Sequence, residues 1–195
     1  MAAVAAPATA GHGARSAIGP RRLGLLIFLA SESMIFISVI AMYLTGQGHQ
    51  GHPSAPEMLD AGRMVPFSIA LWLSSLTIWL AGRRGARLWL TATIVLGAIF
   101  LAGELSEWLD LFGKQVTAAS NVWSTTFFTL TGLHGMHVVL GLLAMLAMFG
   151  YGMRRRLTHD GESAFELVSI YWHFVDGMWV LIYGIVYFWS AFLGG

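Results

Sequence analysis

The sequence predicts an all-α membrane protein, a bundle of five transmembrane helices, and three observations lead to this prediction. Hydrophobic residues make up 56% of the 195 residues and charged residues only 11%, whereas soluble domains carry about 25% charged residues. Five apolar stretches are each long enough to cross the hydrocarbon core, which takes about 20 residues of helix. Lys and Arg are concentrated in alternate connections between these stretches. The chain therefore lacks the polar surface that a water-soluble globule needs.

The predicted helices account for most of the chain after its first twenty residues. Residues 1–20 are rich in Ala and Gly and are predicted to be a disordered leader, followed by one transmembrane domain over residues 21–195. Arginines followed by an apolar run can also mark a cleaved signal peptide, but this run continues to Leu44, which favours a retained first helix. We expect the helices at about residues 22–44, 65–82, 88–112, 122–150 and 165–192.

Positive charge predicts the orientation of the bundle. Nine of the eleven Lys and Arg residues precede the first helix, separate the second from the third, or separate the fourth from the fifth, while Arg63 and Lys114 lie in the other two connections. The positive-inside rule places the set of nine in the cytoplasm, so we expect the N-terminus inside and the C-terminus outside. Lipid phosphates are the expected contacts of six of these arginines. They are Arg83, Arg84, Arg87, Arg154, Arg155 and Arg156.

A few ionisable residues lie within the apolar stretches. A charged group at the bilayer centre costs about 2.5–3.5 kcal/mol on insertion scales, and such residues usually face partners inside the bundle. We expect them to form a buried polar network between helices, and we assign no catalytic residue. The members of this network are Glu32, Glu104, Glu107, His134, His137, His173 and Asp176.

Positions three, four and seven apart share one face of a helix, so these residues form stripes. We expect the stripes to face inward. Small residues that permit close helix approach are expected at Gly24, Ser31 and Ser38 in the first helix and at Gly132, Gly135 and Gly141 in the fourth. The stripe on the third helix comprises Phe100, Glu104, Glu107 and Leu111. The stripe on the fifth helix comprises Glu166, His173, Asp176, Val180, Tyr183 and Tyr187.

The residues supply no complete catalytic or metal centre. The absence of cysteine excludes thiolate-bound Fe–S clusters and c-type haem attachment. The Glu-x-x-Glu and His-x-x-His pairs do not match the Glu-x-x-His pattern of di-iron bundles. His173 with His134 or His137 could ligate one b-type haem, so a five-helix haem b membrane anchor remains open beside hydrogen bonding between helices.

Four segments together resemble one family, the subunit III family of haem-copper oxidases. They are "ASESMIFISVIAMYL", "GAIFLAGELSEW", "TGLHGMHVVLGL" and "YWHFVDGMWVLIYGIVYFW", in the order that the family shows and over about residues 25–192. The chain resembles the five-helix form of the family. Glu104 stands where the family usually has glutamine.

The resemblance implies an accessory subunit of a bacterial cytochrome c oxidase in the plasma membrane, with no catalytic centre, haem or copper of its own. The expected partners are the catalytic subunit I, which would hold haem and copper, together with subunit II and bound phospholipid; no nucleic acid is expected. The family sustains proton uptake into the catalytic subunit and protects it during turnover, and Glu32 matches its carbodiimide-sensitive carboxylate. The equivalent subunit of a quinol oxidase or of a nitric oxide reductase stays open, as does a structural assembly or lipid-binding protein.

Overall fold

The protein is an all-helical bundle in the part of the chain that the structure describes. The computed structural model describes residues 19–46, 59, 61–84, 86–154 and 159–189. Five helices in these ranges are long and apolar enough to cross a membrane, which confirms the predicted fold class. The helices are α1 (Pro20–Gly46), α3 (Ala61–Arg84), α4 (Ala86–Gly113), α5 (Val122–Arg154) and α6 (His159–Tyr183), and a π-helical segment, η1 (Gly184–Trp189), continues α6.

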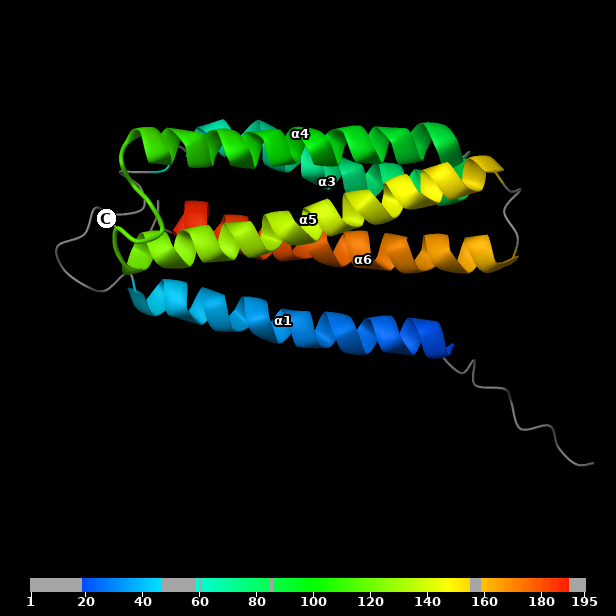
Figure 1. The fold of residues 1–195 in the computed structure, drawn as a ribbon, viewed down its shortest axis with the longest axis horizontal. Helices are drawn as coiled ribbons and strands as arrows, with labels where there is room; N and C mark the ends of the chain where they lie inside the picture. Colours follow the sequence, from blue (N-terminus) through cyan, green and yellow to red (C-terminus); the bar gives the residue numbers. More distant parts are fainter. Residues whose placement is uncertain (1–18, 47–58, 60, 85, 155–158, 190–195) are drawn as a thin grey trace, which may run out of the picture.

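The helices lie side by side along one direction (Figure 1). Helices α3 and α4 pack along each other, α5 contacts α4, α6 and α1, and α6 also contacts α3 and α1. Helix α1 lies at the edge of the bundle and enters the core at Leu29, Phe36 and Tyr43, which are seven residues apart and buried. Most of its other large apolar side chains are exposed, and in a membrane they face lipid.

The arginine-rich connections gather at one end of the bundle. The start of α1, the end of α3, the start of α4, the end of α5 and the start of α6 lie at that end, and the α4–α5 connection lies at the other (Figure 1). This arrangement is the one that the alternating charge pattern requires. Which side of the membrane this end faces stays a prediction from the charges.

Local sequence sets the ends of two helices. Asn121 caps α5, because its side-chain oxygen accepts a hydrogen bond from the Ser124 amide (2.7 Å) and its own amide donates to the Ser124 hydroxyl (3.1 Å). Helix α4 ends in a Schellman motif: Gln115 has φ 61°, and the amide of Val116 donates to Leu111 O (2.9 Å). Leu111 and Val116 are both buried, so the α4–α5 turn is anchored in the core.

Glycines allow large side chains to pass between helices. A Cβ on Gly97 or Gly141 would lie 2.9 Å or 2.7 Å from the ring of Trp172, so this indole of α6 fits between α4 and α5. A Cβ on Gly132 would lie 3.0 Å from the ring of Trp108. The prediction of close packing around the glycines of the fourth helix is confirmed.

Two other expectations from the sequence are wrong. Gly24, Ser31 and Ser38 are exposed on α1, and no atom of the described residues lies within 4 Å of a Cβ placed on Gly24, so in this part of the chain the track of small residues receives no neighbouring helix. The second helix, expected at about residues 65–82, begins earlier as α3, at Ala61, so Pro66 lies inside it. Proline is tolerated in transmembrane helices where neighbouring groups satisfy the freed carbonyl.

Candidate functional site

The ionisable side chains at membrane depth are the candidate functional groups of this protein. All seven lie within the spans of α1, α4, α5 and α6. They divide among separate contacts between different pairs of helices. Glu32 lies with His137, His173 with Asp176, and Glu107 with Tyr187, while Glu104 and His134 are buried apart from these contacts.

Glu32 and His137 join α1 to α5. His137 Nε2 lies 3.2 Å from Glu32 Oε2, and Nδ1 lies 2.7 Å from Leu133 O. A carbonyl oxygen can only accept, so Nδ1 carries a hydrogen. The contact at Nε2 then needs one more proton, which is held either by the carboxyl group as a neutral pair or by the imidazole as an ion pair. Glu32 and His137 therefore form a site that holds one exchangeable proton at membrane depth.

Neighbouring rings orient the imidazole of His137. The ring of Phe36 lies 5.3 Å from it between centroids, and the Tyr171 hydroxyl donates to His137 O at 3.1 Å. His137 is buried, whereas the Glu32 side chain remains 16% exposed toward the outside of the bundle. The carboxyl group is thus the accessible member of the pair.

His173 and Asp176 meet at Ser75 of α3. The Ser75 hydroxyl donates to Asp176 Oδ2 and lies 3.2 Å from His173 Nδ1. Asp176 is buried at 8% exposure, but His173 is exposed. The prediction that the whole stripe of the fifth helix faces inward is therefore wrong, because His173, together with Glu166 and Val180, lies on the outer surface.

This serine, histidine and aspartate do not form a hydrolytic triad. In such a triad the aspartate orients the imidazole, and the imidazole takes the serine proton. Here the serine hydroxyl donates to the aspartate, so the proton is directed away from the base. The cluster is a hydrogen-bonded contact between α3 and α6.

Glu107 of α4 receives a hydrogen bond from the Tyr187 hydroxyl of η1. Both side chains are buried, and the Tyr187 ring stacks on that of Tyr183 with 5.0 Å between centroids. The structure agrees with the prediction that the stripe on the third helix faces inward, since Phe100, Glu104, Glu107 and Leu111 are all buried.

Glu104 and His134 are buried without a hydrogen-bond partner among the described residues. The carboxyl group of Glu104 rests on Gly135, beside a small groove of about 160 Å³ lined by residues of α4 and α5. The imidazole of His134 stacks on Trp179 (4.9 Å between centroids) and meets the edge of Phe100 (5.6 Å). The polar residues thus form separate contacts and no single continuous network among the described residues.

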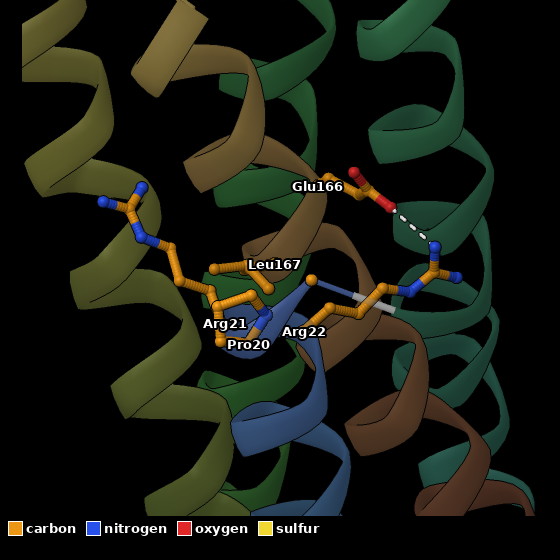
Figure 2. Close-up of a pocket in the computed structure, with 6 residues that line it drawn as sticks. Pro20, Arg21, Arg22, Glu166 and Leu167 are labelled. Carbon is orange, nitrogen blue, oxygen red and sulfur yellow. Dashed lines mark ion pairs between the residues drawn. The ribbon is translucent and has the colours of Figure 1, made fainter. Parts of the chain in front are cut away.

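An ion pair joins the N-terminal end of α1 to α6. Arg22 Nη1 lies 3.2 Å from Glu166 Oε1 of α6, and Figure 2 shows Arg21 pointing away from this pair. A cavity of about 360 Å³ lies at this end of α1 and is lined by Gly19, Pro20, Arg21, Arg22, Glu166 and Leu167. It belongs to the arginine-rich end of the bundle.

The arginines that the sequence assigned to lipid phosphates lie at the same end or outside the described side chains. The guanidinium of Arg83 lies 4.0 Å above the ring of Trp79, and Arg87 is exposed. The side chains of Arg84 and Arg154, and residues 155–156, fall outside what the structure describes. Their expected lipid contacts stay predictions.

Ser75 is the polar partner that sequence reasoning missed. It lies in the second predicted helix, in the run "LSSLT", and its partners are 98 and 101 residues away. Two adjacent serines in an apolar span were the available signal. Across the described residues, no three His, Asp or Glu side chains gather closely enough to hold a metal ion.

The architecture and its polar contacts define a multi-pass membrane protein whose helices carry a few buried ionisable groups. The family model for cytochrome c oxidase subunit III matches residues 64–191. The chain is 34% identical over 177 residues to cytochrome c oxidase subunit 3 of Corynebacterium diphtheriae, an alignment that covers 85% of this chain and 86% of the relative. The chain belongs to the cytochrome c oxidase subunit III family.

Two further relatives show how broad the similarity is. Cytochrome c oxidase subunit 3 of Thermostichus vulcanus is 33% identical over 185 residues, which cover 88% of this chain and 89% of the relative. Cytochrome bo(3) ubiquinol oxidase subunit 3 of Pseudomonas aeruginosa is 31% identical over 176 residues, which cover 86% and 84%. The resemblance seen in four sequence motifs is thus confirmed over most of the chain.

Proposed function

We propose that this chain is the accessory subunit III of a respiratory oxidase that transfers electrons from cytochrome c to O2 and pumps protons, in the plasma membrane of a bacterium. The chain contributes no haem or copper ligand, and the metal centres are held by the catalytic partner subunit. Family membership and the similarity to subunit 3 over most of both chains support this assignment.

The observation that carries the functional part of the proposal is the contact between Glu32 and His137. It is a carboxyl–imidazole pair at membrane depth that holds one exchangeable proton, and the carboxyl group is the more accessible member. Such a pair suits a subunit that sustains proton uptake into its partner and prolongs the partner's active lifetime. Its second role is mechanical, because it ties the peripheral helix α1 to α5.

Bound phospholipid is the second part of the proposal. Arg21 and Arg22 border the cavity at the arginine-rich end, where an anionic headgroup would meet positive charge, and exposed apolar side chains of α1 continue from there along the bundle. Headgroup and acyl chains would thus both find complementary surface. Lipid analysis of the purified complex, with Arg21→Gln beside the unchanged chain, tests this part: loss of one class of retained phospholipid is expected.

Co-purification tests the assignment as a whole. The tagged chain, extracted from its native membrane in mild detergent, should retain a large subunit with the haem and copper spectrum of a terminal oxidase. A stoichiometric haem band that stays with the separated chain would instead identify a haem b anchor. Retention of no oxidase subunit would overturn the proposal.

Turnover tests the role of the carboxyl group. The complex with Glu32→Ala should start at a normal rate and lose activity over fewer turnovers than the unchanged complex. Ser38→Ala is the matched control, because Ser38 is exposed on the same helix and, among the described residues, its hydroxyl group bonds only to the carbonyl of Met34. Equal lifetimes of the Glu32 and Ser38 variants would remove Glu32 from the proposed role.

The equivalent subunit of a quinol oxidase is the second candidate. The similarity to the ubiquinol oxidase subunit of Pseudomonas aeruginosa, at 31% identity, nearly equals that to the cytochrome c oxidase subunits. Oxygen consumption by the purified complex with reduced cytochrome c or with a reduced quinol separates the two candidates. Activity with quinol alone would favour the second.

A further inference from the structure

We propose that the outer face formed by α3 and α6 around His173 docks onto a transmembrane helix of the oxidase partner, and that this helix donates a hydrogen bond to His173. The inference rests on the proposed function, since it names the surface through which the chain joins the complex. On this face of the bundle, His173, Leu76 and Val180 are exposed among the described residues.

The imidazole of His173 is exposed at membrane depth. His173 lies nine residues beyond the start of the α6 span at Ala164, about 13 Å along a helix that rises 1.5 Å per residue. Its ring is therefore near the middle of a hydrocarbon core of about 30 Å. An ionisable or strongly polar group that faces lipid there is costly, and such groups normally face protein.

The hydrogen bonds of Ser75 fix which nitrogen of His173 carries a hydrogen. The only hydroxyl hydrogen of Ser75 is donated to Asp176 Oδ2, so the contact with Ser75 requires a hydrogen on His173 Nδ1. In the neutral imidazole Nε2 then carries a lone pair and acts as an acceptor. The structure shows no partner for Nε2 within the described residues, which is why a donor from another chain fits this position.

The other exposed polar groups at depth behave differently. Among the described residues, exposed hydroxyl groups within the spans donate to carbonyl oxygens one turn earlier in their own helix. Examples are Ser31 to Phe28 O, Ser38 to Met34 O, Thr91 to Arg87 O and Thr129 to Thr125 O. They need no partner, so they are compatible with lipid, whereas His173 is not satisfied by its own helix.

Helix α3 also carries exposed tryptophan side chains. Trp72, near the middle of the α3 span, is 37% exposed and meets Tyr183 of α6 edge to face at 5.9 Å. Trp79, seven residues further along the same face of α3, is 45% exposed. Tryptophan is enriched at protein interfaces and at the membrane–water boundary, and Trp72 is far from that boundary. The large exposed residues in the middle of α4 and α5 are Ile, Val, Leu and Met, which suit lipid, and α1 adds one exposed aromatic residue, Phe28, to residues of these types.

Site-specific photo-crosslinking in the native membrane tests the proposal. A photoreactive residue is placed at Leu76 or Val180 on the α3–α6 face, or at the control positions Ile37 on α1 and Leu143 on α5. All four side chains are between 51% and 61% exposed. We expect cross-links to an oxidase subunit from Leu76 and Val180. Cross-links to that subunit from Ile37 or Leu143, with none from Leu76 and Val180, would overturn the inference.

A matched pair of variants tests the hydrogen bond. His173→Phe should weaken retention of the partner in detergent by roughly fivefold to tenfold, the range of one hydrogen bond between transmembrane helices. Thr91→Val, which removes an exposed but self-satisfied hydroxyl group, should leave retention unchanged. Equal retention with both variants would remove the hydrogen bond from the proposal.

The outcomes separate this inference from the proposed function. If the unmodified chain retains no oxidase subunit, the proposed function fails and the docking surface fails with it. If an oxidase subunit is retained but cross-links only from α1 or α5, the function stands and the α3–α6 face is not the docking surface.

Discussion

Glu104 of α4 rests directly on Gly135 of α5: a methyl group added to Gly135 would lie 2.8 Å from Glu104 Oε2. Glycine at this point lets a full-length acidic side chain occupy the space between two helices. Glu104 is only 6% exposed, and its carboxyl oxygens are buried with no hydrogen-bond partner within the described part of the chain. The α4–α5 contact therefore depends on shape and tolerates a polar group at a cost.

Gly135→Ala should destabilise the bundle, because the new methyl group and the Glu104 carboxyl group cannot both keep their positions. Overpacking of this kind typically costs about 1–3 kcal/mol. Thermal unfolding of the purified complex, followed by loss of the monodisperse species, measures the effect. Combining Gly135→Ala with Glu104→Ala should restore much of the loss, since the second change removes the atoms that clash. Additive losses in the double variant would show that the two residues do not interact.

Gly103→Ala should be more damaging than any substitution at an open glycine. A Cβ on Gly103 would overlap the ring of Phe67, which is held between α3 and α4. Gly24→Ala is the matched control, because no atom lies within 4 Å of that Cβ and alanine favours a helix by about 1 kcal/mol over glycine. Both variants are compared by thermal unfolding in one detergent. A lower melting temperature for Gly24→Ala than for Gly103→Ala would contradict this packing.

Tyr187→Phe should destabilise the contact between η1 and α4. The change removes the hydroxyl group that donates to Glu107 and keeps the ring that stacks on Tyr183. Withdrawing a donor from a buried acceptor costs about 1–3 kcal/mol. Tyr171→Phe serves as control, because its hydroxyl group donates to the backbone carbonyl of His137, an acceptor that the helix already uses. The unfolding midpoint should therefore fall more for Tyr187→Phe.

A hydrophobic carbodiimide should modify Glu32 and leave Glu104 unmodified. The Glu32 side chain is 16% exposed at the edge of the bundle, whereas both carboxyl oxygens of Glu104 are buried against Gly135. Mass spectrometry of peptides from treated membranes locates the adduct. Glu32→Gln should abolish it, while Glu104→Gln should leave it intact. An adduct found on Glu104 in the unchanged chain would show that the α4–α5 groove opens to reagents from lipid.

The sequence alone determined the class of protein and the course of its helices. Apolar runs of sufficient length predict transmembrane helices because an unpaired peptide group is not tolerated in hydrocarbon. Helical spacing correctly predicted that Glu104 and Glu107 face the interior of the bundle, and the glycines around His134 correctly predicted close packing. These features depend on residues within one helix, so they can be predicted from the sequence of that helix alone.

Only the tertiary structure decided which polar groups meet and which remain exposed. His173 and Asp176 lie three residues apart on α6 and both contact Ser75 of α3, yet His173 is exposed and Asp176 is buried. Helical spacing tells which side chains share a face, but it does not tell how much of that face a neighbouring helix covers. That width depends on the position of α3, whose own sequence matched no motif, and so the exposed His173 became visible only in the packed bundle.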